Sequence, residues 1–378
     1  MQEEGWNLAD VRKALQATHE EDFTFSGGEI LGSMCTAPHE LAAEAHALFL
    51  ETNLGDPGHF PGTARLEQEV LDDLASLLHA PADAVGRIVS GGTEANLLAC
   101  LIAKAVTGRR QIVLPSSAHF SFEKAAKLMD LELVHVPVGS DGRADVEAMT
   151  KAVNDKTALV VAVAGTTELG LVDPIEPLAW FCQRNGILLH VDAAYGGYFL
   201  PFLERAGRKP IPFDFALPGV WSVSVDPHKG GMATIPCGAL VLRDGHGWDQ
   251  VAVASPYLST RTQSTLLGTR PGAPVAAAWA VHRHLGMAGF ASIAETCLDN
   301  ATYLAAKLRT MGVAMVATPE LAVVTFRHAD PAKLQERLAQ EGFRVNLVRR
   351  MGAIRIVVNP HVTRKVLDRF LKVLPSCL

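Results

Sequence analysis

The sequence lacks any apolar run of the roughly 18–20 residues that a membrane-spanning helix requires. The longest apolar run, residues 158–165, suits a strand that is buried on both faces of a sheet. The first residues are acidic and contain no apolar segment typical of a secretory signal. We therefore expect a protein that stays in the cytoplasm and has no membrane partner.

Cysteine is scarce, and no pair of cysteines has an obvious chemical role. The six cysteines include no CxxC spacing, so the sequence predicts neither a disulfide framework nor a metal site.

The net charge is −6, and the basic residues are scattered rather than clustered. This pattern disfavours nucleic acid as a partner and leaves a small molecule as the expected ligand.

The length predicts more than one folding unit, because 378 residues exceed the roughly 250–300 at which a single core stops growing. Residues 1–50 carry too little apolar surface to fold alone, so this N-terminal arm should lie on the main body or on a second subunit. We expect a large domain over residues 51–287 and a small C-terminal α+β domain over residues 288–378. A long helical stretch at residues 290–311 is suited to link them.

Short β-branched runs alternate with helical segments through the large domain. This alternation predicts an α/β fold with a mainly parallel sheet, in which ligands bind beyond the carboxyl ends of the strands. The predicted strands are residues 87–89, 111–114, 132–136, 159–163, 187–191 and 220–225. In the small domain we expect strands at 322–326, 343–345 and 354–358, and helices at 331–341 and 363–374.

The residues suited to chemistry directly follow these predicted strands. Lys229 lies in a polar turn between two apolar runs, where a fixed amine can react with a carbonyl compound. Asp192 ends a buried run, so its carboxylate either pairs with a cation or caps the next helix. The segment Gly91–Thr93 joins a strand to a helix and either holds a phosphate or is only a turn.

Together these residues match the three chemical handles of pyridoxal phosphate (PLP). The glycine segment suits its phosphate, Asp192 its ring nitrogen and Lys229 its aldehyde. A carboxylate beside the ring nitrogen keeps that nitrogen protonated, so that the ring can accept electrons. His119 follows another strand, and its flat ring either stacks on the cofactor or caps a helix. The sequence therefore predicts PLP as the cofactor.

Three segments also resemble a known family, namely Ser90–Asn96 (SGGTEAN), His190–Gly197 (HVDAAYGG) and Asp226–Lys229 (DPHK). They are similar to the signatures of group II PLP-dependent amino-acid decarboxylases, over about residues 27–360. Within that group, the sequence resembles the archaeal L-tyrosine/L-aspartate decarboxylases, which supply tyramine for methanofuran or β-alanine for coenzyme A. The segments that carry this closer resemblance are residues 30–35, 51–58, 118–124 and 164–170.

The resemblance implies a fold and a set of site residues. The large domain would have the PLP-dependent transferase-like fold (fold type I) with a seven-stranded sheet, in a homodimer with shared active sites. Lys229 would be the Schiff-base residue, Asp192 the partner of the ring nitrogen and His119 the stacking residue. The other implied cofactor contacts are Gly91, Gly92, Thr93, Thr166 or Thr167, Ala194, His228 and, across the dimer interface, Thr269. Substrate contacts would come from Arg355 and Asn53, with Tyr257 as a candidate proton donor beside Lys229 and His119.

The implied reaction is α-decarboxylation of L-tyrosine, L-aspartate or both, with L-glutamate as an alternative substrate. One rival is retro-aldol cleavage of a phosphorylated amino alcohol, for which the sequence offers no second basic glycine loop. Another is a catalytically silent relative that acts as a scaffold, although intact Lys229, Asp192 and His119 argue against it. Gly230 and Gly231 follow Lys229 where animal members often have a tryptophan, so the pocket details of those enzymes do not transfer.

Overall fold

A seven-stranded sheet lies at the centre of the computed structural model, which describes all residues from 1 to 378. The strand order is β1-β7-β6-β5-β4-β2-β3, and β7 alone runs antiparallel to its neighbours. The bounds are β1 (Val85–Val89), β2 (Gln111–Pro115), β3 (Glu132–Val136), β4 (Thr157–Val163), β5 (Leu188–Asp192), β6 (Ser222–Val225) and β7 (Gly238–Leu242). The predicted α/β fold with a mainly parallel sheet is confirmed, and each of the six strands predicted for the large domain overlaps an observed one.

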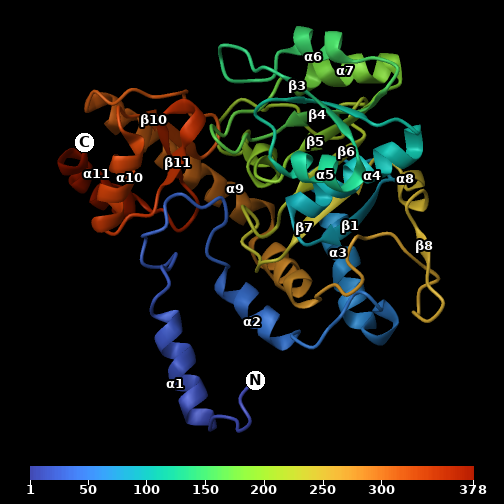
Figure 1. Ribbon diagram of the computed structural model, residues 1–378, viewed down its shortest axis with the longest axis horizontal. Coiled ribbons are helices and arrows are strands. Elements are labelled where there is room, and N and C mark those ends of the chain that lie inside the picture. Colours follow the sequence, from blue (N-terminus) through green and yellow to red (C-terminus); the bar gives the residue numbers. More distant parts are fainter.

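Helices cover both faces of this sheet (Figure 1). Alternate residues of β4 show how the two faces are filled. Leu159 and Val161 belong to the smaller apolar core, with α4 and α5, whereas Val160 and Ala162 belong to the larger core, with α7. The helices are α3 (Pro61–Leu77), α4 (Gly92–Thr107), α5 (Ser121–Met129), α6 (Val146–Ala152), α7 (Ile175–Asn185) and the short α8 (His246–Asp249).

The helix α9 (Ala273–Thr310) leads from this sheet to a second, smaller one (Figure 1). Its helical geometry is interrupted at Gly286, where φ is +53° and ψ is −170°, so it forms two helical stretches, of which the second contains the linking helix that the sequence predicts. Gly286 lies beside the expected boundary between residues 287 and 288. The three-domain division itself stays a prediction.

The small sheet is antiparallel and has the order β10-β12-β11, with β10 (Val323–Arg327), β12 (Ala353–Val357) and β11 (Asn346–Val348). It packs with α10 (Pro331–Gln340) and α11 (Arg364–Cys377). The strand expected at residues 343–345 begins only at Asn346. The backbone of Arg344 is used elsewhere, because its N–H donates to Glu29 O and its carbonyl accepts from Leu31 and Gly32.

The N-terminal arm divides into three parts. The helix α1 (Leu8–His19) has no buried residue and stands away from the body, whereas α2 (Glu40–Leu48) packs on α9 (Figure 1). Between them, residues 29–36 are tied to the small sheet. Asn359 Nδ2 donates to the carbonyls of Ser33, Met34 and Cys35 at 3.1–3.2 Å.

None of the helices combines the length and the apolar character that a membrane span needs.

The remaining elements are short. The short elements are the hairpin β8 (Val253–Ala254) and β9 (Thr262–Gln263), and the 3₁₀ turns η1 (Pro57–His59), η2 (Gly196–Tyr198), η3 (Leu200–Phe202) and η4 (Arg349–Met351).

Candidate active site

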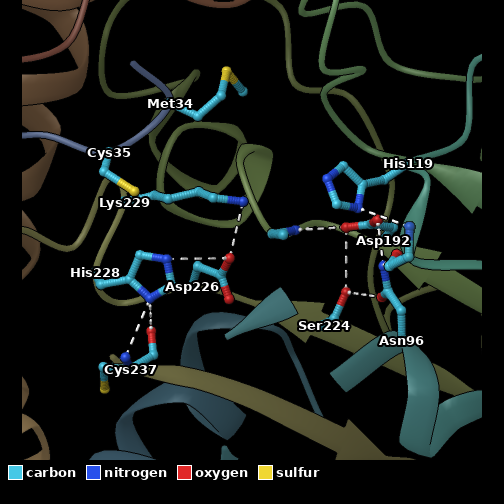
Figure 2. Close-up of polar contacts among 12 residues, drawn as sticks. Met34, Cys35, Asn96, His119, Asp192, Ser224, Asp226, His228, Lys229 and Cys237 are labelled. Carbon is cyan, nitrogen blue, oxygen red and sulfur yellow. Dashed lines mark hydrogen bonds and ion pairs between the residues drawn. The ribbon is translucent and has the colours of Figure 1, made fainter. Parts of the chain in front are cut away.

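A cavity of about 350 Å³ opens where the segments after β1, β2, β5 and β6 meet, at the carboxyl ends of the parallel strands. This is the edge of the sheet at which the sequence predicts a ligand. Figure 2 shows Lys229 and Asp192 pointing into it from different segments. The predicted cofactor residues that line the cavity are Gly91, Gly92, Thr93, His119, Asp192, Ala194, His228 and Lys229.

Lys229 is held by Asp226, to which the sequence alone assigned no role. The Lys229 Nζ lies 2.9 Å from Asp226 Oδ2, while Asp226 Oδ1 is buried without a partner. Burial lowers the pKa of Lys229, but the charges of Asp226 and, more weakly, Asp192 outweigh it and raise the pKa above the ordinary value. The amine is therefore kept protonated in the cofactor-free protein.

The start of α4 forms a cradle for an anion. Gly91 has φ of +152° and ψ of 178°, a conformation that is essentially restricted to glycine. A Cβ atom on Gly92 would lie 2.8 Å from Ala194 Cβ, so this wall has no room for a side chain. No side chain caps the first turn of α4, and its N–H groups face the cavity end at which Thr93 lies. Such a helix start favours a phosphate.

Asp192, at the end of β5, is buried and held by three donors. Its Oδ2 accepts from Asn96 Nδ2 at 2.8 Å. Its Oδ1 accepts from the Ala194 N–H at 3.1 Å and faces Ser224 Oγ at 3.3 Å. These hydrogen bonds fix the position of the carboxylate, which suits a partner of a protonated ring nitrogen.

His119 presents a neutral ring to the same cavity. Burial is the largest influence on its pKa and lowers it, although Asp192 acts in the opposite direction. Its Nδ1 accepts the N–H of Ser121 at 3.2 Å, so the proton of the neutral ring lies on Nε2. The ring centroid is 4.1 Å from that of Phe120. A neutral flat ring in this position suits stacking.

Five predicted residues do not line the cavity of this chain. Thr166 is buried, and its Oγ1 accepts from Leu171 N, whereas the neighbouring Thr167 lines the cavity. Asn53 Oδ1 is used inside a turn, where it accepts from the N–H groups of Gly55 and Arg270. The others are Arg355, which lies behind Thr167, and the exposed Thr269 and Tyr257.

Tyr257 requires a correction. Its side chain is 84% exposed in the segment between β8 and β9, outside the cavity. The sequence pattern could not show this, because a tyrosine in a polar segment carries no signal for the direction in which the loop folds. A role for Tyr257 as proton donor within its own chain is therefore not supported.

The donor set of the cavity fits PLP. It offers an amine, a carboxylate fixed by hydrogen bonds, a neutral ring and an uncapped helix start, one for each part of that cofactor. Asp226 could have been found from the sequence by the argument applied to Asp192, since both carboxylates end a buried run. Asn96 carried no such signal, because a polar residue inside a helix is usually exposed.

We predict that Asp226→Asn lowers the pKa of Lys229. Burial, which lowers this pKa, would then no longer be opposed by the negative charge of Asp226. For each pH unit by which that pKa falls, the free amine at neutral pH increases about tenfold. Mass spectrometry of Lys229 labelling by an amine reagent, at several pH values in cofactor-free protein, measures this. Asp214→Asn is the matched control, since Asp214 is buried but pairs with His79 outside the cavity. An unchanged labelling profile in Asp226→Asn would contradict the assignment.

Comparison with known proteins identifies the same chemistry. Residues 31–329 match the model described as the pyridoxal-dependent decarboxylase conserved domain. A protein of Methanoculleus marisnigri, named probable L-tyrosine/L-aspartate decarboxylase, is 46% identical over 98% of each chain. A protein of Pyrococcus abyssi, named probable L-aspartate decarboxylase, is 41% identical and covers 100% of this chain and 98% of its own.

Solved structures agree on the fold. The glutamate decarboxylase of Lactobacillus brevis has a TM-score of 0.92 at 22% identity, and the alignment covers 100% of this chain and 93% of that one. The sphingosine-1-phosphate lyase of Burkholderia pseudomallei has a TM-score of 0.91 at 28% identity, and the alignment covers 100% of this chain and 91% of that one. With the family match over most of the chain, and with lysine, carboxylate and helix start in one cavity, this chain belongs to the pyridoxal-dependent decarboxylases.

Proposed function

We propose that this PLP-dependent amino-acid decarboxylase acts on L-tyrosine, L-aspartate or both. The names of its relatives support these two substrates. The products would be tyramine, a precursor of methanofuran, and β-alanine, a precursor of coenzyme A. The observation that carries the proposal is the placement of Lys229 and Asp192 in one cavity that also holds the uncapped start of α4.

Each cavity residue would have a distinct task. Lys229 Nζ would bind the aldehyde, Asp192 would accept the ring N–H, and the start of α4 would hold the phosphate. PLP, when bound, accepts the electron pair that stays on Cα as carbon dioxide leaves. Of the proposed proton donors, Lys229 and His119 line the cavity, and the raised pKa of Lys229 lets its Nζ hold the proton that returns to Cα.

We place the α-carboxylate of the substrate at Arg355. Its side chain is 6% exposed, and its Nη1 and Nη2 donate to the carbonyls of Thr167 and Gly32 at 2.6 and 2.7 Å. Its buried Nε has no hydrogen-bond partner, so the guanidinium keeps an unused donor that a carboxylate would satisfy. A carboxylate held there is fixed relative to the cofactor, and that orientation selects the bond that breaks.

The walls of the cavity favour an aromatic side chain. Met34, Phe120 and Ile235 line it. No arginine lines it, and Lys229 is its only lysine. Arg350, a cation that could meet the second carboxylate of L-aspartate, pairs with Glu168 outside it. Within one chain, these contacts support L-tyrosine more strongly than L-aspartate.

Carbon dioxide release from L-tyrosine, L-aspartate and L-glutamate tests the proposed substrates. We expect release from L-tyrosine at the highest kcat/KM, and none from a Lys229→Ala variant, which should also lose the visible absorbance of the lysine-bound cofactor. Release from L-glutamate alone would overturn the substrate assignment. If the protein cleaves a phosphorylated amino alcohol and releases carbon dioxide from none of the three amino acids, its reaction is instead that of the lyase, whose fold this chain shares.

The variant Arg355→Gln tests the carboxylate site. The loss of a charged, two-point contact should lower kcat/KM by about 100-fold or more. Arg355→Lys should recover only part of this loss, because lysine keeps the charge without the planar pair of donors. Arg350→Gln serves as the control and should change kcat/KM for L-tyrosine little. Equal effects of the two glutamine substitutions would contradict the role of Arg355.

We also propose a homodimer that covers the N-terminal arm. Leu8 and Leu15 on α1 are 63% and 66% exposed, and Trp6 before the helix is exposed as well. These apolar side chains find no cover in one chain, although a helix of this kind normally buries its apolar stripe. Phe120 and Ile235 are likewise exposed at the cavity. A second copy would cover these residues and bring Thr269 and Tyr257 to a neighbouring cavity.

Light scattering of the full chain should give twice the mass of one chain. Replacing Leu8 and Leu15 by glutamate should shift the population toward single chains, because charged side chains disfavour burial. Lys13→Glu, on the opposite face of α1, is the control and should leave the mass unchanged. A wild-type mass equal to one chain would rule out the dimer.

A further inference from the structure

Behind Asp192 lies a buried polar network that the proposed mechanism does not use. It connects Asn96 on α4 with His190 on β5 and with Ser222 and Ser224 on β6 (Figure 2 shows Asn96, Asp192 and Ser224). The four side chains are at most 1% exposed. Packing polar groups this deeply is unfavourable unless every donor and acceptor is paired.

The charge of Asp192 fixes the orientation of the Asn96 amide. Its Nδ2 lies 2.8 Å from Asp192 Oδ2 and 2.9 Å from Ser121 Oγ. In the flipped orientation, the amide oxygen would face the carboxylate at that distance, with two acceptors and no proton between them. Asn96 must therefore donate to Asp192, and its Oδ1 must point to the opposite side.

His190 meets the amide on that opposite side. Its Nε2 lies 2.9 Å from Asn96 Oδ1, which can only accept, so Nε2 carries the proton. The other ring nitrogen, Nδ1, lies 2.8 Å from Ser222 Oγ and accepts its proton. Complete burial lowers the pKa of His190 to about 4, with the charge of Asp192 acting in the opposite direction, so the ring is neutral at physiological pH.

We infer that Asn96 is a positioning residue for the cofactor, which holds the Asp192 carboxylate aimed at the ring nitrogen while His190 holds Asn96 in its orientation. The hydrogen bonds form one directed chain, from Ser222 through His190 and Asn96 to Asp192. Ser222 Oγ and His190 Nε2 each have one acceptor, and the two protons of Asn96 Nδ2 have two, Asp192 Oδ2 and Ser121 Oγ. Rotation of any member leaves a buried group unpaired.

This inference separates Asn96 from a residue that only stabilises the fold. If Asn96 acts through Asp192, its removal should weaken only ligands that use the ring nitrogen. The suitable pair of probes is PLP and its deaza analogue, in which a C–H group replaces that nitrogen. A general loss of structure would weaken both probes equally.

The experiment measures the dissociation constants of both probes for the cofactor-free full chain. Asn96→Leu should raise the constant for PLP about tenfold or more, the effect of losing a hydrogen bond to a charged group, and leave that for the deaza analogue nearly unchanged. Asn300→Leu is the matched control, since Asn300 is also buried but contacts Arg364 away from the cavity. It should change neither constant.

The smaller Asn96→Ala variant gives the same comparison if the leucine variant does not fold. In isotope-labelled wild-type protein, nitrogen NMR should also find the His190 proton on Nε2. An equal weakening of both probes, unchanged PLP binding, or a proton on Nδ1 would each overturn the inference. None of these outcomes depends on which amino acid is the substrate, so the test is independent of the proposed function.

Discussion

The structure depends on placing two carboxylates and one ammonium group at the end of a buried sheet. Asp192 and Asp226 follow neighbouring strands and are 6% and 1% exposed, close to Lys229. Isolated charges at such depth would be strongly unfavourable, so the site is stable only because each charge has a partner. The partners of the two carboxylates differ. Asp226 pairs with the ammonium group of Lys229. Asp192 accepts hydrogen bonds from the neutral donors of Asn96 and Ala194, and its carboxylate keeps one side free for the cofactor.

The glycines near this site follow from the same crowding. At Gly238, a Cβ atom would lie 2.7 Å from Asp226 Oδ1 and still closer to the backbone of Gly91. The segment before α4, the strand β7 and the Lys229 turn therefore meet without side chains between them. This close backbone contact leaves the helix start open to a ligand. The geometry of the site therefore itself requires glycine at these positions.

Much of this arrangement could be predicted from the sequence, because periodicity and chain order carry it. The strands β1 to β6, Lys229, Asp192 and the glycine segment all belong to short local patterns. Contacts that depend on distant segments were not accessible. The displacement of β11 depends on Glu29 and Leu31, and the exposure of Tyr257 depends on how a long loop folds. The role of Asn96 became visible only from the distances between side chains.

Hydrogen bonds hold residues 29–36 against the small domain, so the site is built from two parts of the chain, the large domain and the small domain with this segment. Asn359 holds the carbonyls of Met34 and Cys35, and Arg355 belongs to the same small sheet. The groups that fit the cofactor all lie on the large sheet and its loops. These groups therefore lie on the large domain, and the proposed carboxylate site at Arg355 lies on the small one. Residues 29–36 join the two at the cavity itself, because Met34 and Cys35 also line it.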